Sequence, residues 1–120
     1  MTATGTDGPW TFSVTIRSDE TGCDQYADWW EIVTPDGELV YRRILAHSHP
    51  DDQPFTRAGE QPADVTSTVE VYVRAHLAPG GYVGSVFGGT VDGGFSEIAV
   101  ADGFAADLES VAPQPDGCLF

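Results

Sequence analysis

The clearest pattern in the chain is a strict alternation of apolar and polar residues over positions 10–17. The apolar residues occupy every second position, namely Trp10, Phe12, Val14 and Ile16. Because successive side chains of a strand point to opposite faces, this pattern predicts a strand with one buried face. Residues 69–77 alternate in the same way, with valines, Ala75 and Leu77 on one face, and predict a second strand of this kind.

A turn signal at Pro35-Asp36-Gly37 separates two further segments, residues 26–34 and 38–47. Proline presets the first turn position, aspartate suits the second, and glycine takes the left-handed conformation of a bulged hairpin. The two segments are therefore predicted to pair as a hairpin. Residues 82–91 and 96–101 are expected to form two more strands.

Two adjacent tryptophans, Trp29 and Trp30, lie on the first strand of this hairpin. Counting back from the turn places Trp30 opposite Arg42 and Trp29 opposite Arg43, and each pair allows a guanidinium to cover an indole face. Adjacent strand residues point to opposite faces, so we expect one indole in the core and the other near the surface, under an arginine or a protein partner. The hairpin is thus the predicted partner surface.

The remaining segments contain little predicted helix. Residues 50–62 are rich in proline and polar residues and are expected to be a crossover loop anchored by Phe55. Residues 103–111 predict one or two helical turns, because their apolar residues fall at helical spacing. About six to eight short strands with at most this C-terminal helical turn predict an all-β fold, an antiparallel β-sandwich. We expect it to be immunoglobulin-like in architecture only, because the Trp and Cys positions do not follow the antibody-domain pattern.

Residues 1–120 are expected to form a single domain, since a chain of this length can bury roughly two thirds of its unfolded surface. Residues 1–9 are expected to be flexible. They have neither a cationic start nor an apolar run, so the chain as given shows no signal peptide, and no apolar segment is long enough to span a membrane. We therefore expect a cytoplasmic protein, although a processed or truncated sequence would hide an export signal and leaves export open.

The two cysteines, Cys23 and Cys118, lie near opposite ends of the chain. If they pair, chain entropy predicts a stabilisation of roughly 4 to 5 kcal/mol. Disulfides are rare in cytosolic proteins, so two reduced cysteines are the expected state and pairing is the alternative.

Charge indicates the solvent in which the protein works. The formal net charge is −14, from 19 acidic residues against five basic ones, all arginines. Such a surface repels itself in dilute buffer, whereas at about 1 M salt the screening length falls to ~3 Å and the surface stays soluble. The composition therefore predicts a halophilic, salt-adapted acidic protein that binds cations from high salt weakly. It also argues against partners with a phosphate backbone or an anionic membrane surface, so neither nucleic acid nor a membrane is expected.

The histidines form the one candidate site for chemistry. His47 and His49 are two residues apart at the end of a predicted strand, and His76 lies near the end of another. If those strand ends meet, three imidazoles converge and can bind Zn or Cu, with a fourth ligand from Asp51, Asp52 or Cys23. The competing interpretation is that the histidines are solvated or paired with the abundant carboxylates.

Other catalytic patterns are weaker. Ser48 points to the face of its strand opposite to His47 and His49, so it does not make a nucleophile and base pair. Acidic neighbours of Cys23 disfavour a reactive thiolate. Residues 80–84 are rich in glycine but lack the spacing of a phosphate-binding loop. We therefore expect a noncatalytic binding or accessory module without a cofactor. The alternative hypothesis is a Zn- or Cu-binding protein or enzyme.

Several short motifs suggest a relationship to other proteins. They are YADWWE at residues 26–31, YRRILAHSH at 41–49, QPF at 53–55 and VRAH at 73–76. In these motifs the chain resembles small prokaryotic all-β proteins of unassigned function. The resemblance implies no activity and assigns no site residue, but it marks the histidines and the Trp-Arg hairpin as the first parts to test.

Overall fold

The computed structural model describes residues 2–4, 10–18, 20–51, 53–60, 63–78, 80–82, 84–115 and 117–118. Within these ranges the chain forms strands and one short 3-10 helix, in the order β1 (Thr2–Thr4), β2 (Thr11–Ile16), β3 (Tyr26–Val33), β4 (Leu39–Ile44), β5 (Phe55–Ala58), β6 (Val71–Ala78), β7 (Val86–Thr90), β8 (Gly94–Ile98) and η1 (Ala106–Ser110). Residues 2–4 belong to the segment that was expected to be flexible, and they pair with β2. The rest of that segment lies outside the described residues.

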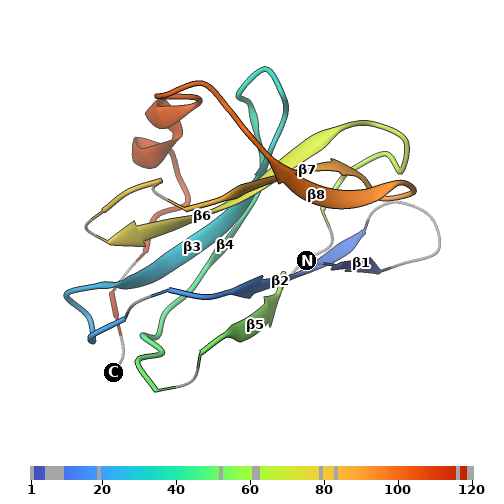
Figure 1. Cartoon of the computed structure of the whole chain (residues 1–120). Helices are drawn as coiled ribbons and strands as arrows, with labels where there is room; N and C mark the ends of the chain where they lie inside the picture. The colour runs from blue at the N-terminus through green and yellow to red at the C-terminus, as the bar shows by residue number, and fades with distance from the viewer. Residues whose placement is uncertain are drawn as a thin grey trace.

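The strands form two antiparallel sheets that face one another (Figure 1). The smaller sheet has the order β1-β2-β5 and the larger sheet has the order β4-β3-β6-β7-β8. The helix η1 lies beyond the face of the larger sheet that points away from the smaller one (Figure 1). The prediction of an all-β, antiparallel sandwich with a short C-terminal helical turn is therefore confirmed.

The core fills the space between the two sheets. Along β2, Phe12, Val14 and Ile16 are buried and the residues between them are not, as the alternation predicts. They pack with Trp30 and Ile32 of β3 and with other buried apolar residues, among them Leu45, Phe55, Val71 and Val73. One contiguous core therefore joins the sheets.

β3 is buried along its whole length, on both faces. Its inner face belongs to the core, and its outer face lies beneath residues 104–113, which contain η1 and are called the C-terminal strap below. On β6 the polar residues Arg74 and His76 are also buried, at 4% and 7% exposure. The alternation on β6 predicted a solvated polar face, and the strap is the reason that this face is covered.

The hairpin of β3 and β4 turns at Pro35-Asp36-Gly37 as expected, with Gly37 in the left-handed region at φ +88°. Its register differs from the prediction. Val40 is an extra residue, because Ile32 pairs with Tyr41 while Val33 pairs with Leu39. Beyond this bulge every partner on β4 is displaced by one position.

The bulge changes which side chains meet across the hairpin. Trp30 pairs with Arg43, and Arg42 pairs with Glu31. The predicted pairs of Trp30 with Arg42 and Trp29 with Arg43 are therefore wrong. Because of the displacement, Arg42 lies on the outer face of the sheet beside Glu31 and Trp29.

The segment 50–62 was expected to be a loop, yet it contains β5, which pairs with β2. Its anchor Phe55 is buried as predicted, at 3% exposure. The strand is only four residues long and follows a proline, so its sequence carries little periodic signal.

Candidate functional site

The three histidines, His47, His49 and His76, have separate surroundings. No group of three or more His, Cys, Asp or Glu side chains in the described ranges is arranged to hold a metal ion. Asp52, one of the ligands considered for such a site, lies outside those ranges. The predicted convergence of His47, His49 and His76 is therefore not found in the described part of the chain.

His76 belongs to the outer face of the larger sheet. Its Nδ1 atom lies 2.6 Å from Oδ1 of the buried Asp28, and its Nε2 atom lies 3.2 Å from Oε2 of Glu109 on the strap. The imidazole stacks on Trp29 and meets Tyr82 edge on. Both ring nitrogens therefore face carboxylates, as in the interpretation that paired the histidines with acids.

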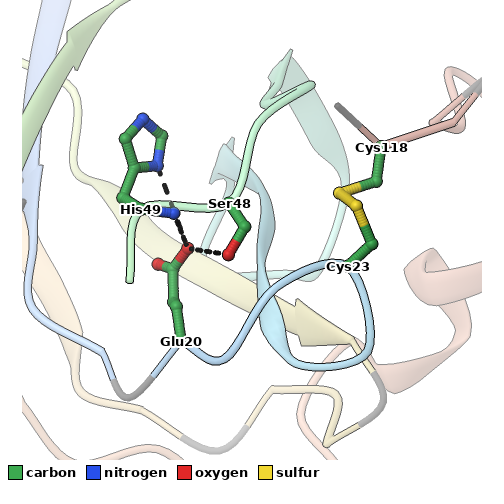
Figure 2. Close-up of a disulfide and its surroundings, with 5 residues drawn as sticks. All are labelled: Glu20, Cys23, Ser48, His49 and Cys118. Carbon is green, nitrogen blue, oxygen red and sulfur yellow. Dashed lines mark hydrogen bonds and ion pairs between the residues drawn. A yellow bond between two sulfur atoms is a disulfide. The ribbon is translucent and has the colours of Figure 1, made fainter. Parts of the chain in front are cut away.

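His49 is buried on the chain that follows β4. Its backbone N–H donates to Oε1 of Glu20 at 2.7 Å, and its ring Nδ1 lies 3.8 Å from the same oxygen. Figure 2 shows this carboxylate directed at His49 and Ser48 from the loop that leads to Cys23. Glu20 thus fixes the position of the whole turn that contains His49.

The tautomer of His49 follows from its second neighbour. Nη2 of Arg57 lies 2.8 Å from Nε2 of His49. A guanidinium has donors only, so Nε2 accepts this hydrogen bond and the proton of the neutral ring is on Nδ1, towards Glu20. The Nε2 lone pair is therefore already used, which leaves it poorly suited to bind a metal ion.

His47 is exposed, while His49 is buried. They were expected to share one face of a strand, but β4 ends at Ile44, before either of them. They do line one pocket of about 290 Å³, together with Arg43, Leu45, Ala46, Arg57 and Glu60. Below, this hollow is called the cationic pocket.

Arg43 and Arg57 are positioned in the cationic pocket by backbone carbonyls. Arg43 donates from Nε to the oxygen of Ala58 at 2.8 Å and from Nη1 to Oε1 of Glu60 at 3.1 Å. Arg57 donates from Nη1 to the oxygen of Thr56 at 2.8 Å. Both guanidiniums are partly solvent-exposed, so the pocket offers fixed cationic groups to solvent.

A second group of charges lies on the outer face of the larger sheet, around Glu31. This side chain is fully buried, at 0% exposure. Its Oε1 atom accepts from Nε and Nη2 of Arg42 at 2.9 and 2.7 Å, and its Oε2 atom accepts from Nε and Nη2 of Arg74 at 2.9 and 2.8 Å. One carboxylate therefore bridges two guanidiniums in a site that excludes water.

The same two arginines fasten the C-terminal strap. Arg42 donates to the carbonyl oxygens of Leu108, Val111 and Pro113, and Arg74 donates to those of Phe104 and Ala105. Together with its bonds to Glu31, Arg42 uses all five of its N–H donors. The carbonyl dipoles offset the excess positive charge of two arginines against one carboxylate.

Aromatic rings complete this outer layer. The guanidinium carbon of Arg42 lies 4.2 Å from the ring centre of Trp29, and that of Arg74 lies 3.5 Å from the ring centre of Tyr82. Burial, and next the negative charge of Glu31, raise the pKa of Tyr82 to about 12. Its hydroxyl donates to Glu31 at 3.1 Å, which favours the neutral phenol.

Both tryptophans of the hairpin are buried, Trp29 at 2% and Trp30 at 0% exposure. Trp29 does lie under an arginine, Arg42, but the strap covers that arginine too. The expectation that one indole lies near the surface is therefore wrong. Neither ring offers an exposed surface to a protein partner, because the chain's own C-terminal strap occupies that face.

The cysteines form a disulfide between Cys23 and Cys118 (Figure 2). Their Cα atoms are 5.7 Å apart, within the usual range for such a bond. The expectation of two reduced cysteines is wrong, because the fold returns the end of the chain to the loop between β2 and β3. The disulfide therefore attaches the chain just after the strap covalently, in addition to the hydrogen bonds that Arg42 and Arg74 donate to the strap.

Sequence reasoning identified His47 and His49 but missed Glu20, Arg57 and Glu31. Glu20 lies 29 residues before His49 and Arg57 lies eight residues after it, and no regular spacing links either residue to the histidine motif. Glu31 resembles an ordinary exposed residue of an alternating strand. No local pattern in the sequence marks any of these three residues.

Comparisons with known proteins give one relative. The chain is 44% identical over 75 residues to a protein of Halomicrobium mukohataei named "Putative lipoprotein", and the match covers 61% of this chain and 35% of that protein. The chain thus spans about a third of the length of this relative. No family model and no solved structure match the chain. In the described residues no helix has the length and apolar character needed to cross a membrane.

Proposed function

We propose that this chain is an exported, noncatalytic β-sandwich module that serves as a binding or accessory domain in a salt-adapted organism. The observation that carries the proposal is the disulfide between Cys23 and Cys118. Stable disulfides are a feature of oxidising compartments outside the cytoplasm and are rare inside it. The proposal therefore replaces the cytoplasmic expectation with an extracytoplasmic one.

Two further facts support this placement. The relative is named "Putative lipoprotein", a name consistent with export, and this chain matches about a third of it. In addition, a formal charge of −14 without lysine suits a surface in contact with concentrated salt. A folded module within a longer anchored protein accounts for both.

The geometry supports binding rather than catalysis. The buried groups best suited to acid–base chemistry are Glu31, Asp28 and His76. They lie under the C-terminal strap, and their partners are one another, Arg74 or the strap. The Zn or Cu alternative receives no support from the described residues, since Nε2 of His49 is occupied by Arg57 and His76 faces Asp28 and Glu109.

Expression of the chain within its native protein tests the proposal. Surface and cytoplasmic fractions are alkylated before and after reduction, and the mass shift counts the thiols. We expect the protein in the surface fraction, with both cysteines blocked until reduction. Recovery in the cytoplasmic fraction with two free thiols overturns the proposal. Metal analysis of the untagged protein, purified in high salt, is expected to find no bound transition metal, and one Zn or Cu per chain supports the metal alternative instead.

A further inference from the structure

The cationic pocket concentrates the scarce positive charge of this molecule. Of the five arginines, Arg42 and Arg74 are buried beneath the strap, and Arg43 and Arg57 both line this pocket. His47 and His49 line it as well, so two of the three histidines are there. Among the residues that the structure describes, Glu60 is the only acidic one in the lining, and its side chain is 71% exposed. In a chain of net charge −14, this is a local reversal of sign.

The reversal is a fixed part of the fold. Arg43 is anchored on the carbonyls of Ala58 and Ile44, and Arg57 on the carbonyl of Thr56 and the ring of His49. Behind them His49 stacks on Phe55 with ring centres 3.9 Å apart. The two guanidiniums therefore keep their positions without a ligand, and binding one costs little side-chain entropy.

Both arginines retain donors for a ligand. Nη2 of Arg43 and Nε of Arg57 have no hydrogen-bond acceptor among the residues that the structure describes. Nη1 and Nη2 of Arg57 each use one N–H, on Thr56 and His49, and keep a second. Planar guanidinium donors match the paired oxygens of carboxylate, sulfate and phosphate better than a spherical chloride ion. This difference matters in a medium where chloride is abundant.

From these contacts we propose that the cationic pocket binds a small molecule through an oxyanion group, a carboxylate, sulfate or phosphate, held between Arg43 and Arg57. The volume of about 290 Å³ leaves room for more than the oxyanion itself, and Leu45 and Ala46 supply an apolar wall for the rest of the molecule. The inference deepens the proposed binding function by naming the ligand class. It does not depend on where in the cell the protein acts.

Titration of the folded protein with sodium acetate, sulfate or phosphate, at constant high NaCl, tests the site. The arginine Nε–H signals in nitrogen-proton NMR spectra are the readout. We expect saturable shifts at Arg43 and Arg57 with millimolar half-saturation and no saturable shift at Arg17. The three salts distinguish the kinds of oxyanion by their order of affinity.

Substitutions separate the site from the fold. Arg57→Gln is expected to weaken binding at least about tenfold by removing one charge-assisted partner. Arg43→Lys retains the charge but loses the planar pair of donors, so it is also expected to weaken binding. Glu60→Gln is expected to strengthen binding, because it removes a carboxylate that competes for Arg43. Arg17→Gln is the matched control and is expected to leave binding unchanged.

Shifts that stay linear for all three anions, or that respond equally to Arg17→Gln and Arg57→Gln, overturn the proposal. If Arg57→Gln unfolds the protein, Arg43→Lys and Glu60→Gln still decide the question, since they change affinity in opposite directions. Anion binding in a protein that proves cytoplasmic refutes the proposed location alone. Export without anion binding refutes this inference alone.

Discussion

The imidazole of His76 lies flat against the indole of Trp29, with ring centres 3.8 Å apart and an angle of 4° between the planes. The two residues are direct partners across β3 and β6. Arg42 covers the same indole, and Glu109 of the strap reaches the far nitrogen of the imidazole. The stacked rings are therefore flanked by the charged groups of Arg42 and Glu109. They connect β3, β6 and the C-terminal strap.

Replacement of either tryptophan by alanine is expected to destabilise the protein strongly. Trp29 and Trp30 are both buried, so each change leaves a large cavity and costs roughly 3 to 5 kcal/mol. Denaturant unfolding in high salt measures both losses. Val69→Ala is the control, because that side chain is 52% exposed and its loss is expected to change stability by less than about 0.5 kcal/mol. A loss below about 1 kcal/mol for Trp29→Ala contradicts the coverage by the strap.

Glu31→Ala is expected to cost about 3 to 5 kcal/mol, because it leaves two buried guanidiniums without their carboxylate. Buried pairs are screened far less than exposed ones, so this loss is expected to be similar at low and high KCl. Unfolding free energies over a KCl series measure it.

The matched control is Glu60→Ala, which removes the exposed partner of Arg43. It is expected to cost about 0 to 1 kcal/mol, and less as salt rises. If the two variants respond to KCl in the same way, Glu31 is not shielded from solvent as the structure describes.

The sequence predicts the core between the two sheets and the β3–β4 hairpin well. Alternation along β2 and β6 and the turn at Pro35-Asp36-Gly37 are local signals, and the core and hairpin follow from them. The layer on the outer face of the larger sheet depends instead on a contact between β3 and the C-terminal strap, which follows about 70 to 80 residues later in the chain. No local pattern distinguishes a polar face in water from a polar face under such a strap, so Glu31, Arg42 and Arg74 read as surface residues.

The errors in the candidate site have similar causes. One extra residue, Val40, reverses which face of the sheet Arg42 occupies, and the sequence of the hairpin does not show where a bulge falls. The end of β4 at Ile44 places His47 and His49 in irregular chain, where spacing by two no longer means a shared face. Pairing of Cys23 with Cys118 depends on the path of the whole chain.

Removal of the disulfide is expected to lower stability by roughly 2 to 5 kcal/mol, as is usual for a native bond in a small domain. Cys23→Ser, Cys118→Ser and the double variant are expected to lose similar amounts, because each breaks the same bond. Unfolding free energies of the three variants and of the reduced parent protein test this. Losses that add in the double variant contradict a bond between the two residues.

The behaviour of Tyr82 gives a prediction in alkaline solution. Burial and Glu31 raise its pKa to about 12 in the folded protein, against an ordinary value of 10.0 in the unfolded chain. The neutral phenol thus stabilises the fold fully below pH 10, and this contribution disappears as pH rises through about 12. We therefore expect the stability of the parent protein, measured as its free energy of unfolding, to fall relative to that of Tyr82→Phe in that interval.

Phenolate absorbance provides the direct measurement. One tyrosine is expected to titrate near pH 12, and Tyr82→Phe is expected to abolish that step. If the step persists in this variant, it does not belong to Tyr82.

The net charge predicts that salt stabilises the protein. With 19 acids on the chain and a net charge of −14, screening of their repulsion is expected to raise the melting temperature steadily between dilute buffer and molar KCl. Thermal unfolding followed by circular dichroism measures the change. A melting temperature that is flat or falls over this range contradicts salt adaptation.

The bond between Cys23 and Cys118 also determines how the molecule responds to a cut in its backbone. The strands from β3 to β8 lie between these cysteines, so a protease that cleaves one exposed loop in this region leaves every piece covalently connected. β1 and β2 lie before Cys23, outside the ring, and they remain attached through the chain at residues 17–22. A single cut there leaves these two strands held by hydrogen bonds and core packing alone. A cut between β1 and β2 likewise separates β1, whereas no single cut between Cys23 and Cys118 divides the protein.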